Sequence, residues 1–532
     1  MPLSTALVIG ALAAAGAAAA VDVTVTADLS GAGQVQQSFF MLDCVGASHG
    51  EMYMWEDNRN HLRAIARDIG FKHVRGHGLL NDDLSTYLNG RANMWNLHSI
   101  FDFLLSINMR PVFELSFTPA ELASDPTDSL MHYRANASPA KDRNASAGHS
   151  WYDFIHDLTA DLVDRYGIEE IRQWRFEHYN EPNCGFFHGT STQWYEQYAA
   201  ASAAIKSVDN LIQVGGPATC ALGWLGSTAG NNFMQQVKTM GIATDIVTTH
   251  LYPTDDIVDK TLGRDGFSAV IKEAAANVTA FGYEGMPLVM TEFNAGLGLP
   301  TEVNGDTAYT AAMVLHNHLA LQGVANLETL SFWSYSDIFE EGGMDSQPWH
   351  NGYGIMNVNG VPKPIYRLFE MLKALPASAV PVTAQVATPS DVIVPRVGSV
   401  SAGQVDVVVA VDASQHPLIH VTALMNNFDL YSLPVANKTV QVNFARLPAG
   451  AVVPNVATLD RIDSTHANPR AVWDAAGGPQ YCSPTEIAAE LAASQLVGEG
   501  LALTSNADGS LSALLTLEPF SVARIRFSYT VE

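Results

Sequence analysis

The sequence predicts an α/β fold, a (β/α)₈ TIM barrel, followed by an accessory β-sandwich. Between residues 37 and 376, short β-branched and aromatic runs alternate with amphipathic helical stretches. This alternation is typical of βα units around a parallel sheet. Eight such units in about 340 residues suit a barrel with inserted loops. In residues 377–532 the helical rhythm gives way to runs of alternating apolar and polar residues, which favours a β-sandwich.

The first twenty residues, MPLSTALVIGALAAAGAAAA, have the pattern of a secretory signal. The apolar run is short and ends in small residues, which favours cleavage near Ala20 over a membrane anchor. We therefore expect a secreted, extracellular protein, or one in a lysosome-like or vacuole-like lumen. Four glycosylation motifs agree with this route, and they begin at Asn136, Asn144, Asn277 and Asn437. Residues 21–36 follow, and their VDVTVTADL run predicts a strand that joins the sandwich.

Eight segments between residues 37 and 376 predict the barrel strands. They are SFFMLDCVG (38–46), KHVRGHG (72–78), RPVFELSF (110–117), QWRFEHYNEP (173–182), IQVGGPAT (212–219), DIVTTHLYP (245–253), PLVMTEFNA (287–295) and TLSFWSYSD (329–337). Helices are expected between them, for example over 58–70, 97–108, 151–167 and 307–323. An open doubly wound sheet is the alternative, but no G-x-G-x-x-G motif opens a helix here, which weakens it.

The sandwich strands are expected in residues 377–532. They correspond to VDVVVAVDAS (405–414), HVTALMNNF (420–428), KTVQVNFARL (438–447), LALTSNADGSLSALLTL (501–517) and SVARIRFSYT (521–530). Asp508-Gly509 predicts a hairpin turn within the fourth of these segments. One helix, over 484–495, interrupts the region.

The composition limits the kinds of binding partner that can be expected. Lys and Arg number 28 against 54 Asp and Glu, for a net charge of −26, so a nucleic-acid partner is not expected, because binding phosphates requires a basic face. Beyond the first twenty residues, no stretch is apolar enough to cross a membrane.

Four cysteines are too few for a disulfide scaffold. Cys184 and Cys220 would follow adjacent barrel strands, where a bridge and two free thiols are equally plausible. No zinc-ligand spacing occurs, so neither a metal nor a cofactor is expected.

Two glutamates occupy the positions where a barrel places its chemistry. Glu181 follows the fourth predicted strand and Glu292 ends the seventh. Active residues of such barrels lie at the carboxyl ends of the strands, and strands four and seven face each other across the barrel. Paired carboxyl groups are what glycoside cleavage requires, one protonated and one ionised. The pattern therefore predicts that Glu181 and Glu292 together supply the acid/base and the nucleophile of a glycosidase, which would be a retaining one if the two groups lie about 5 Å apart.

Polar and aromatic residues at other strand ends fit a sugar pocket, whose partner would be a carbohydrate. Asn180 precedes the acid/base and suits donation to a sugar 2-hydroxyl. Arg75 admits two interpretations: it keeps the nucleophile ionised, or it is a structural cation paired with Glu114 or Glu177. The other candidate contacts are His77 after strand two, His250 and Tyr252 after strand six, Trp333 after strand eight, and Glu340 and Glu341 beyond it. A solvated loop is the alternative for Glu340 and Glu341.

Most of the predicted barrel, including the residues named above, resembles glycoside hydrolase family 39, the clan A family of β-xylosidases and α-L-iduronidases. The resemblance is carried by GFKHVRGHGLLNDDLS, RPVFELSFTPAELAS, DRYGIEEIRQWRFEHYNEPN, VGGPAT, PLVMTEFNA, SFWSYSDIFEE and WHNGYGIMNVNGVPKPIYRLFEML. It implies the acid/base position for Glu181 and the nucleophile position for Glu292. It implies sugar contacts for His77, Asn180, His250, Tyr252, Trp333, Glu340 and Glu341. Tyr179, where the family usually has Trp, and Phe293-Asn294 depart from the pattern.

The loop after strand eight distinguishes between substrates. An iduronide would require Lys or Arg to hold the sugar carboxylate, whereas this loop contains Asp337, Glu340 and Glu341. An exo-acting β-xylosidase, which releases xylose from non-reducing ends, is therefore favoured. An α-L-iduronidase-like enzyme or a broad β-glycosidase is the second choice. A glycan-binding protein without turnover is the competing class, and the presence of both glutamates weighs against it. The oligomeric state does not follow from the sequence.

Overall fold

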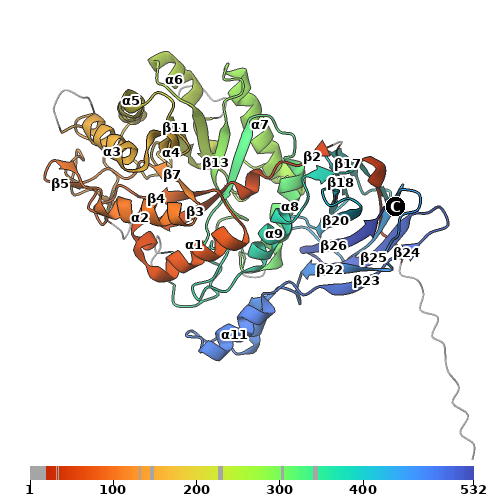
Figure 1. Ribbon diagram of the computed structural model, residues 1–532. Coiled ribbons are helices and arrows are strands. Elements are labelled where there is room, and N and C mark those ends of the chain that lie inside the picture. The colour runs from red at the N-terminus through yellow and green to blue at the C-terminus, as the bar shows by residue number, and fades with distance from the viewer. Residues whose placement is uncertain are drawn as a thin grey trace, which may run out of the picture.

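In the computed structural model, a closed barrel of eight parallel strands lies beside a sandwich of two sheets (Figure 1). The structure describes residues 20–31, 33, 35–130, 134–143, 149–225, 232–300, 303, 305–339 and 345–531. The fold class predicted from the sequence is confirmed. Residues 1–19 of the expected signal, Asn144, Glu340 and Glu341 lie outside the described residues.

All eight predicted barrel strands are present. They are β3 (Cys44–His49), β4 (His73–His77), β7 (Arg110–Glu114), β10 (Arg175–Glu177), β11 (Gln213–Thr219), β12 (Ile246–His250), β13 (Leu288–Phe293) and β14 (Leu327–Phe332). The first strand begins later than predicted, because Phe40–Leu42 form a 3₁₀ turn that buries Phe40 and Met41. The fourth strand ends earlier, because Tyr179 and Glu181 adopt left-handed backbone angles, with φ of 69° and 37°.

Helices follow the strands and enclose the barrel (Figure 1). They are α1 (Glu56–Asp68), α2 (Trp95–Ser106), α3 (Trp151–Tyr166), α4 (Ile168–Ile171), α5 (Ser191–Val208), α6 (Phe233–Met240), α7 (Gly266–Ala280), α8 (Ala308–Ala320) and α9 (Pro364–Lys373). Local sequence sets their ends: Ser150 and Asp153 form a reciprocal capping box at the start of α3. Gly167 ends α3 with φ 84°, a backbone angle that glycine adopts without steric cost.

Two short hairpins decorate the loops at the carboxyl ends of the strands. The pair β5 (Tyr87–Leu88) and β6 (Arg91–Ala92) follows β4, and the pair β8 (Ser129–Leu130) and β9 (Ala135–Asn136) follows β7. Asn136, the first glycosylation-motif asparagine, is buried here, and its Nδ2 donates to the backbone oxygen of Asp125 at 2.9 Å. This contact occupies the atom to which a glycan would attach.

The sandwich consists of a five-stranded and a nine-stranded sheet. The smaller one contains β16 (Val382–Val386), β1 (Val23–Asp28), β21 (Lys438–Ala445), β25 (Leu511–Leu517) and β24 (Thr504–Ser505), in that order. The larger one contains β17 (Ile393–Arg396), β18 (Ser399–Ala402), β19 (Val405–Asp412), β20 (Leu418–Asn427), β26 (Ser521–Thr530), β22 (Val456–Ile462) and β23 (Glu499–Ala502), with β15 (Ser378–Ala379) and β2 (Val35–Gln36) at its side. Strand β1 pairs with β16 and β21, so the described chain enters the sandwich before it forms the barrel.

Two helices, α10 (Pro469–Ala475) and α11 (Pro484–Ala493), lie between β22 and β23. The sequence predicted only the second of them. They reach the barrel loop that follows β14, where Glu490 accepts a 3.0 Å hydrogen bond from the indole of Trp349. Arg470 donates to the side chain of Asn351 in the same loop at 3.0 Å. The accessory domain thus contacts the loop after β14 as well as helices α8 and α9 on the side of the barrel.

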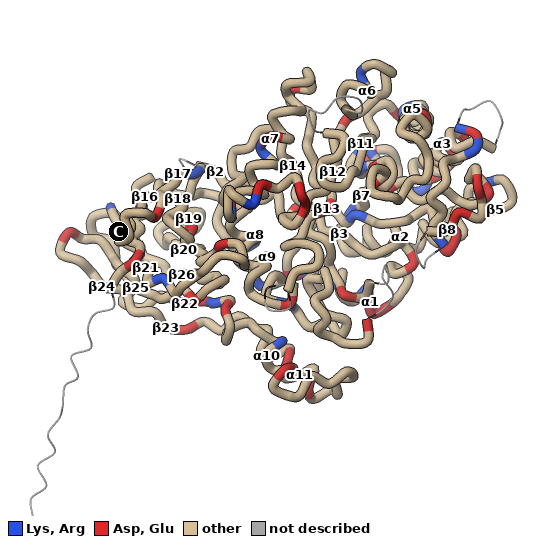
Figure 2. Tube along the Cα trace, turned by 180° about the vertical axis from the view of Figure 1, so that it is seen from behind, with Lys and Arg blue, Asp and Glu red and all other residues tan. Residues whose placement is uncertain are grey.

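Charged residues are spread over both the barrel and the sandwich (Figure 2). At the junction between the two domains, Asp406 of β19 is buried and contacts Arg264, Arg396 and His316 of α8. His318, two positions further along α8, stacks on Phe39 instead. Within the described part of the chain, no helix has the length and apolar character needed to span a bilayer.

Candidate active site

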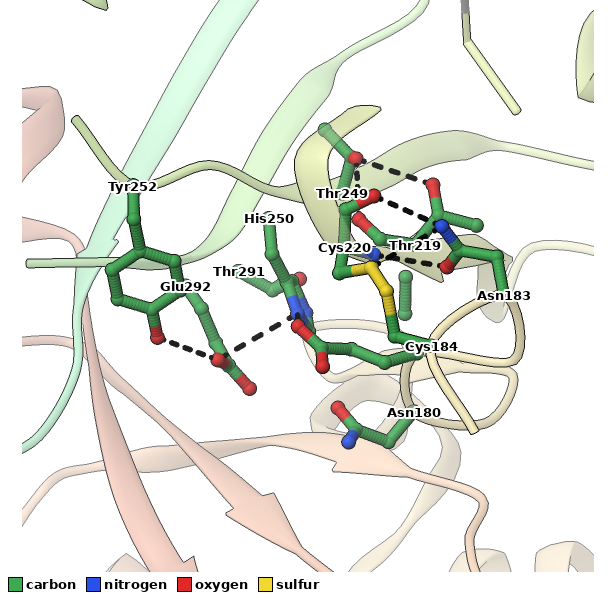
Figure 3. Close-up of polar contacts among 12 residues, drawn as sticks. Asn180, Asn183, Cys184, Thr219, Cys220, Thr249, His250, Tyr252, Thr291 and Glu292 are labelled. Atoms are coloured by element: carbon green, nitrogen blue, oxygen red, sulfur yellow. Dashed lines mark hydrogen bonds and ion pairs between the residues drawn. A yellow bond between two sulfur atoms is a disulfide. The ribbon is translucent and has the colours of Figure 1, made fainter. Parts of the chain in front are cut away.

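Glu181 and Glu292 converge around His250 at the carboxyl end of the barrel, where Figure 3 shows Glu292 beside His250 and Tyr252. One oxygen of each carboxylate and Nδ1 of His250 all lie within 4.8 Å of one another. The side chain of Glu181 is 15% exposed and that of Glu292 is 7% exposed. The two carboxylates, from the ends of β10 and β13, therefore lie close together and are largely shielded from solvent.

The backbone around Glu181 sets the direction of its side chain. Tyr179 and Glu181 both have positive φ angles, which few residues other than glycine adopt and which persist only where the surroundings enforce them. The amide of Glu181 donates to the backbone oxygen of Ala218 at 2.8 Å. This hydrogen bond ties the end of β10 to the end of β11, so the acid side chain is directed from a fixed backbone.

Arg75 is the central cation of the site and is fully buried. Its guanidinium lies 2.5 Å from Glu114, 2.5 Å from Glu177 and 2.7 Å from Glu292. It also donates to Oδ1 of Asn180 at 2.9 Å, which leaves the amide NH₂ group of Asn180 for the pocket. Both sequence interpretations of Arg75 therefore describe contacts that occur: it contacts the candidate nucleophile and two structural carboxylates at once.

Three groups surround the carboxylate of Glu292. Arg75 donates to Oε1 at 2.7 Å, and the phenol of Tyr252 donates to Oε2 at 2.8 Å. Nδ1 of His250 lies 3.6 Å from Oε2. Burial raises the pKa of Glu292, while His250 and Arg75 oppose that shift. Because Arg75 and Tyr252 both hydrogen-bond the charged form, the arrangement favours an ionised Glu292.

Glu181 has a different environment. Its Oε1 lies 2.7 Å from Nδ1 of His250. Burial raises the pKa of Glu181 to about 7, even though Arg75 and His77 lower it. Burial also lowers the pKa of His250 to about 4, so that this imidazole is neutral near pH 7. A neutral His250 beside Glu181 does not favour ionisation of the carboxyl group, and Glu181 can therefore carry a proton near neutral pH.

Trp333 and His77 form an aromatic wall. Their rings meet edge to face with centroids 5.6 Å apart, and Nδ1 of His77 lies 3.1 Å from Glu114. The guanidinium carbon of Arg75 lies 5.8 Å from the centroid of the Trp333 ring. A Cβ atom at Gly46 of β3 would overlap the indole, so glycine at this position allows Trp333 to approach the strand.

The loop after β14 requires a correction. The sequence argument placed Asp337 among acidic residues facing the sugar, but Asp337 is buried and lies 2.6 Å from Nζ of Lys363. Lys363 also contacts Asp306 at 2.7 Å and donates to the backbone oxygen of Gly352 at 3.0 Å. Asp337 therefore ties loops together. Glu340 and Glu341 lie outside the described residues.

Sequence reasoning missed some of the residues that support the site. Asn294 donates from Nδ2 to the backbone oxygens of Trp333 and Tyr353, and thereby fixes the loop after β14. Thr291 donates to Glu177 at 2.7 Å. The only sequence signal for Asn294 was its place beside Glu292, because partners on distant loops cannot be read from local pattern.

The two cysteines whose state the sequence left open form a disulfide. Cys184 and Cys220 are joined with their Cα atoms 6.3 Å apart (Figure 3). The bridge connects the loop after β10, which carries Glu181, to the loop after β11. The described free cysteines are Cys44 and Cys482.

Two groups of described side chains are spaced closely enough to hold a metal ion: Glu181, His250 and Glu292, and separately His49, Glu51 and Asp83. In the first group, the 2.7 Å separation between His250 and Glu181 is a hydrogen-bond distance. Arg75 and Tyr252 already occupy both oxygens of Glu292. Side chains of the protein therefore already hydrogen-bond both carboxylates of the first group.

Two glutamates lie at facing strand ends of a (β/α)₈ barrel, one beside a cation and one where burial favours the protonated form. This arrangement is that of a glycoside hydrolase. Comparison with known proteins gives the family. The chain belongs to the glycosyl hydrolases family 39, whose model matches residues 24–510. The protein is therefore a glycosidase that acts on carbohydrate, and the family inferred by resemblance is confirmed.

Individual relatives agree with this family. The chain is 30% identical to a β-xylosidase of Caldicellulosiruptor saccharolyticus over 497 residues, which cover 91% of this chain and 94% of the relative. It is 26% identical to the α-L-iduronidase of Mus musculus over 171 residues, which cover 31% and 24% of the two chains. The fold is similar to that of a family 39 β-xylosidase from Caulobacter crescentus, with a TM-score of 0.74, 23% identity, and 95% and 99% of the chains covered.

Proposed function

We propose that this glycosidase is a retaining, exo-acting β-xylosidase in which Glu292 is the nucleophile and Glu181 the general acid/base. The observation that carries the proposal is the approach of the two carboxylates, with one oxygen of each within 4.8 Å of the other. Retaining enzymes hold their carboxyl groups about 5 Å apart, whereas inverting enzymes need a larger gap for a water molecule.

In the first step, an oxygen of Glu292 attacks the anomeric carbon and the bond to the leaving oxygen breaks. Glu181 transfers its proton to that oxygen, so that the aglycone departs as a neutral alcohol. Arg75 and Tyr252 hold the attacking carboxylate in position. Asn180, with Oδ1 bound to Arg75, presents its NH₂ group to the sugar 2-hydroxyl, where a hydrogen bond strengthens as oxocarbenium character grows.

In the second step, Glu181, now ionised, removes a proton from water as the water oxygen attacks the anomeric carbon. The bond to Glu292 breaks, xylose is released with its original configuration, and Glu181 regains its proton. His250 fits both steps, because its neutral ring contacts Glu181 directly. His77 and Trp333 form the apolar wall, and we assign Glu340 and Glu341 to the sugar hydroxyls.

Charge supports a neutral sugar. An iduronide carboxylate requires a cation that is free to pair with it. Two described cations of the strands and loops around the site are already paired: Arg75 contacts three carboxylates, and Lys363 contacts Asp306 and Asp337. The β-xylosidase relative, which aligns over nearly the whole chain, points the same way.

Aryl β-xylosides, arabinosides, β-glucosides and iduronides, assayed side by side, test the proposal. We expect the highest kcat/KM for the xyloside. Glu292→Gln should abolish hydrolysis of that substrate while the protein stays folded, and Glu273→Gln on the outer helix α7 is the matched control. Preference for an iduronide would overturn the substrate, and no cleavage of any substrate would favour a glycan-binding protein.

A further inference from the structure

The loop that carries Glu181 is held from outside by one covalent bond. After Glu181 the chain turns away from the barrel, and both Asn183 and Cys184 are exposed. Cys184 is joined to Cys220, which follows β11 and lies 36 positions further along the chain. Only two residues separate Glu181 from Cys184, and the amide of Cys184 donates to the backbone oxygen of Glu181 at 2.9 Å. The bridge is therefore coupled directly to the backbone of the acid/base.

Hydrogen bonds reinforce the same connection. The side chain of Asn183 donates from Nδ2 to the backbone oxygen of Cys220 and accepts from its amide at Oδ1, each at 3.1 Å. The amide of Glu181 donates to Ala218. Figure 3 shows Asn183 beside the Cys184–Cys220 disulfide, with Glu292 further away beside Tyr252. Because Asn183 is exposed, water competes for its hydrogen bonds, whereas the disulfide is not exchanged in this way.

The two joined loops have an unfavourable backbone. Glu181 has φ 37°, Ala218 near the end of β11 has φ 51°, and Ala221 and Leu222 on the loop after β11 have φ of 49° and 56°. Residues with a Cβ atom rarely adopt these angles, and they keep them only where surrounding contacts enforce them. Without the bridge, the exposed loop can relax toward ordinary angles, and that movement would displace the carboxyl group of Glu181.

We infer that the Cys184–Cys220 disulfide is a positioning element for the acid/base, so that its reduction impairs proton transfer by Glu181 and leaves nucleophilic attack intact. The inference rests on the proposed role of Glu181. The selectivity follows from the other half of the site: Glu292 lies on β13 and is held by Arg75 and Tyr252, neither of which contacts either cysteine. Cys184 is exposed and Cys220 is partly exposed, so a reductant can reach the bridge.

The test compares two aryl β-xylosides by kcat/KM, which reports the first bond-breaking step. Phenyl xyloside has a poor leaving group that needs a proton, whereas the 2,4-dinitrophenolate of the second substrate leaves without one. For the reduced protein and for Cys184→Ser/Cys220→Ser, we expect a loss of about tenfold or more on phenyl xyloside, since a displaced catalytic group costs up to about 10²-fold. The dinitrophenyl substrate should change less than about twofold.

Three controls separate the outcomes. Cys482→Ser is the matched substitution outside the site and should behave as the unaltered protein, and the double serine variant should not respond to reductant. Glu181→Ala tests the acid/base role independently, because its kcat/KM should fall on phenyl xyloside and not on 2,4-dinitrophenyl xyloside. If Glu181→Ala shows this selectivity and the reduced protein does not, the positioning role is wrong. If Glu181→Ala lacks the selectivity, the proposed function itself fails. Equal losses on both substrates in the reduced protein would indicate a merely structural bridge and would overturn the inference.

Discussion

The phenol of Tyr252 donates a 2.8 Å hydrogen bond to Oε2 of Glu292, on the oxygen that Arg75 leaves free. A hydrogen bond to a buried charged group contributes about 1.5–3 kcal/mol. Tyr252→Phe removes only this hydroxyl, so we expect kcat/KM on an aryl xyloside to fall roughly 10-fold to 100-fold. Steady-state kinetics on the purified variant measures this. Unchanged kinetics would show that the phenol does not support the nucleophile.

The pH dependence should report Glu181. Burial raises the pKa of this carboxyl group to about 7, and the general acid acts only when protonated. Activity is therefore present below this pKa and declines as the pH rises through it, about tenfold in kcat/KM per pH unit. A pH profile with phenyl xyloside measures this decline, the alkaline limb of the profile. With 2,4-dinitrophenyl xyloside, the control substrate, the alkaline limb should be absent. A limb shared by both substrates would have to come from a group other than the proton donor.

Arg75 should be essential for folding as well as for catalysis. Arg75→Met leaves Glu114, Glu177 and Glu292 buried without their common cation, and breaking a buried ion pair from one side costs about 3–5 kcal/mol. Arg75→Lys keeps the charge but loses the planar fork, so its loss should be smaller. Urea unfolding of the two variants gives the comparison. Equal stability of the Met variant and the unaltered protein would contradict the network.

Lys363 provides a parallel case outside the reacting groups. Lys363→Met removes the cation that contacts both Asp306 and Asp337, which are fully or nearly fully buried, and should cost about 3–5 kcal/mol of unfolding free energy. Because burial raises the pKa of Asp337, the variant should recover part of its stability at acidic pH, where the Asp337 carboxyl group becomes neutral. Thermal melts at several pH values check this; a loss independent of pH would point to packing instead.

Much of this architecture could be predicted from sequence because its signals are local. Eight apolar runs at regular spacing gave the barrel, and the position of Glu181 and Glu292 at the ends of two such runs gave the candidate pair. The left-handed turns at Tyr179 and Glu181 could not be predicted, since neither residue type favours them. The predicted environment of Asp337 was wrong for a different reason. Its partner Lys363 lies on a later segment, and a count of local charges does not reveal an ion pair that only the tertiary structure forms.

The central claim, that Glu292 is the nucleophile of a double displacement, can be tested by trapping its covalent intermediate. A 2-deoxy-2-fluoro-xyloside with a good leaving group slows the second step more than the first, so the sugar stays attached to the enzyme. Peptide mass spectrometry should then find one fluoroxylosyl group, on the peptide that contains Glu292 and on that residue within it. A label on another carboxylate, or turnover that releases xylose of inverted configuration with no label at all, would contradict the account.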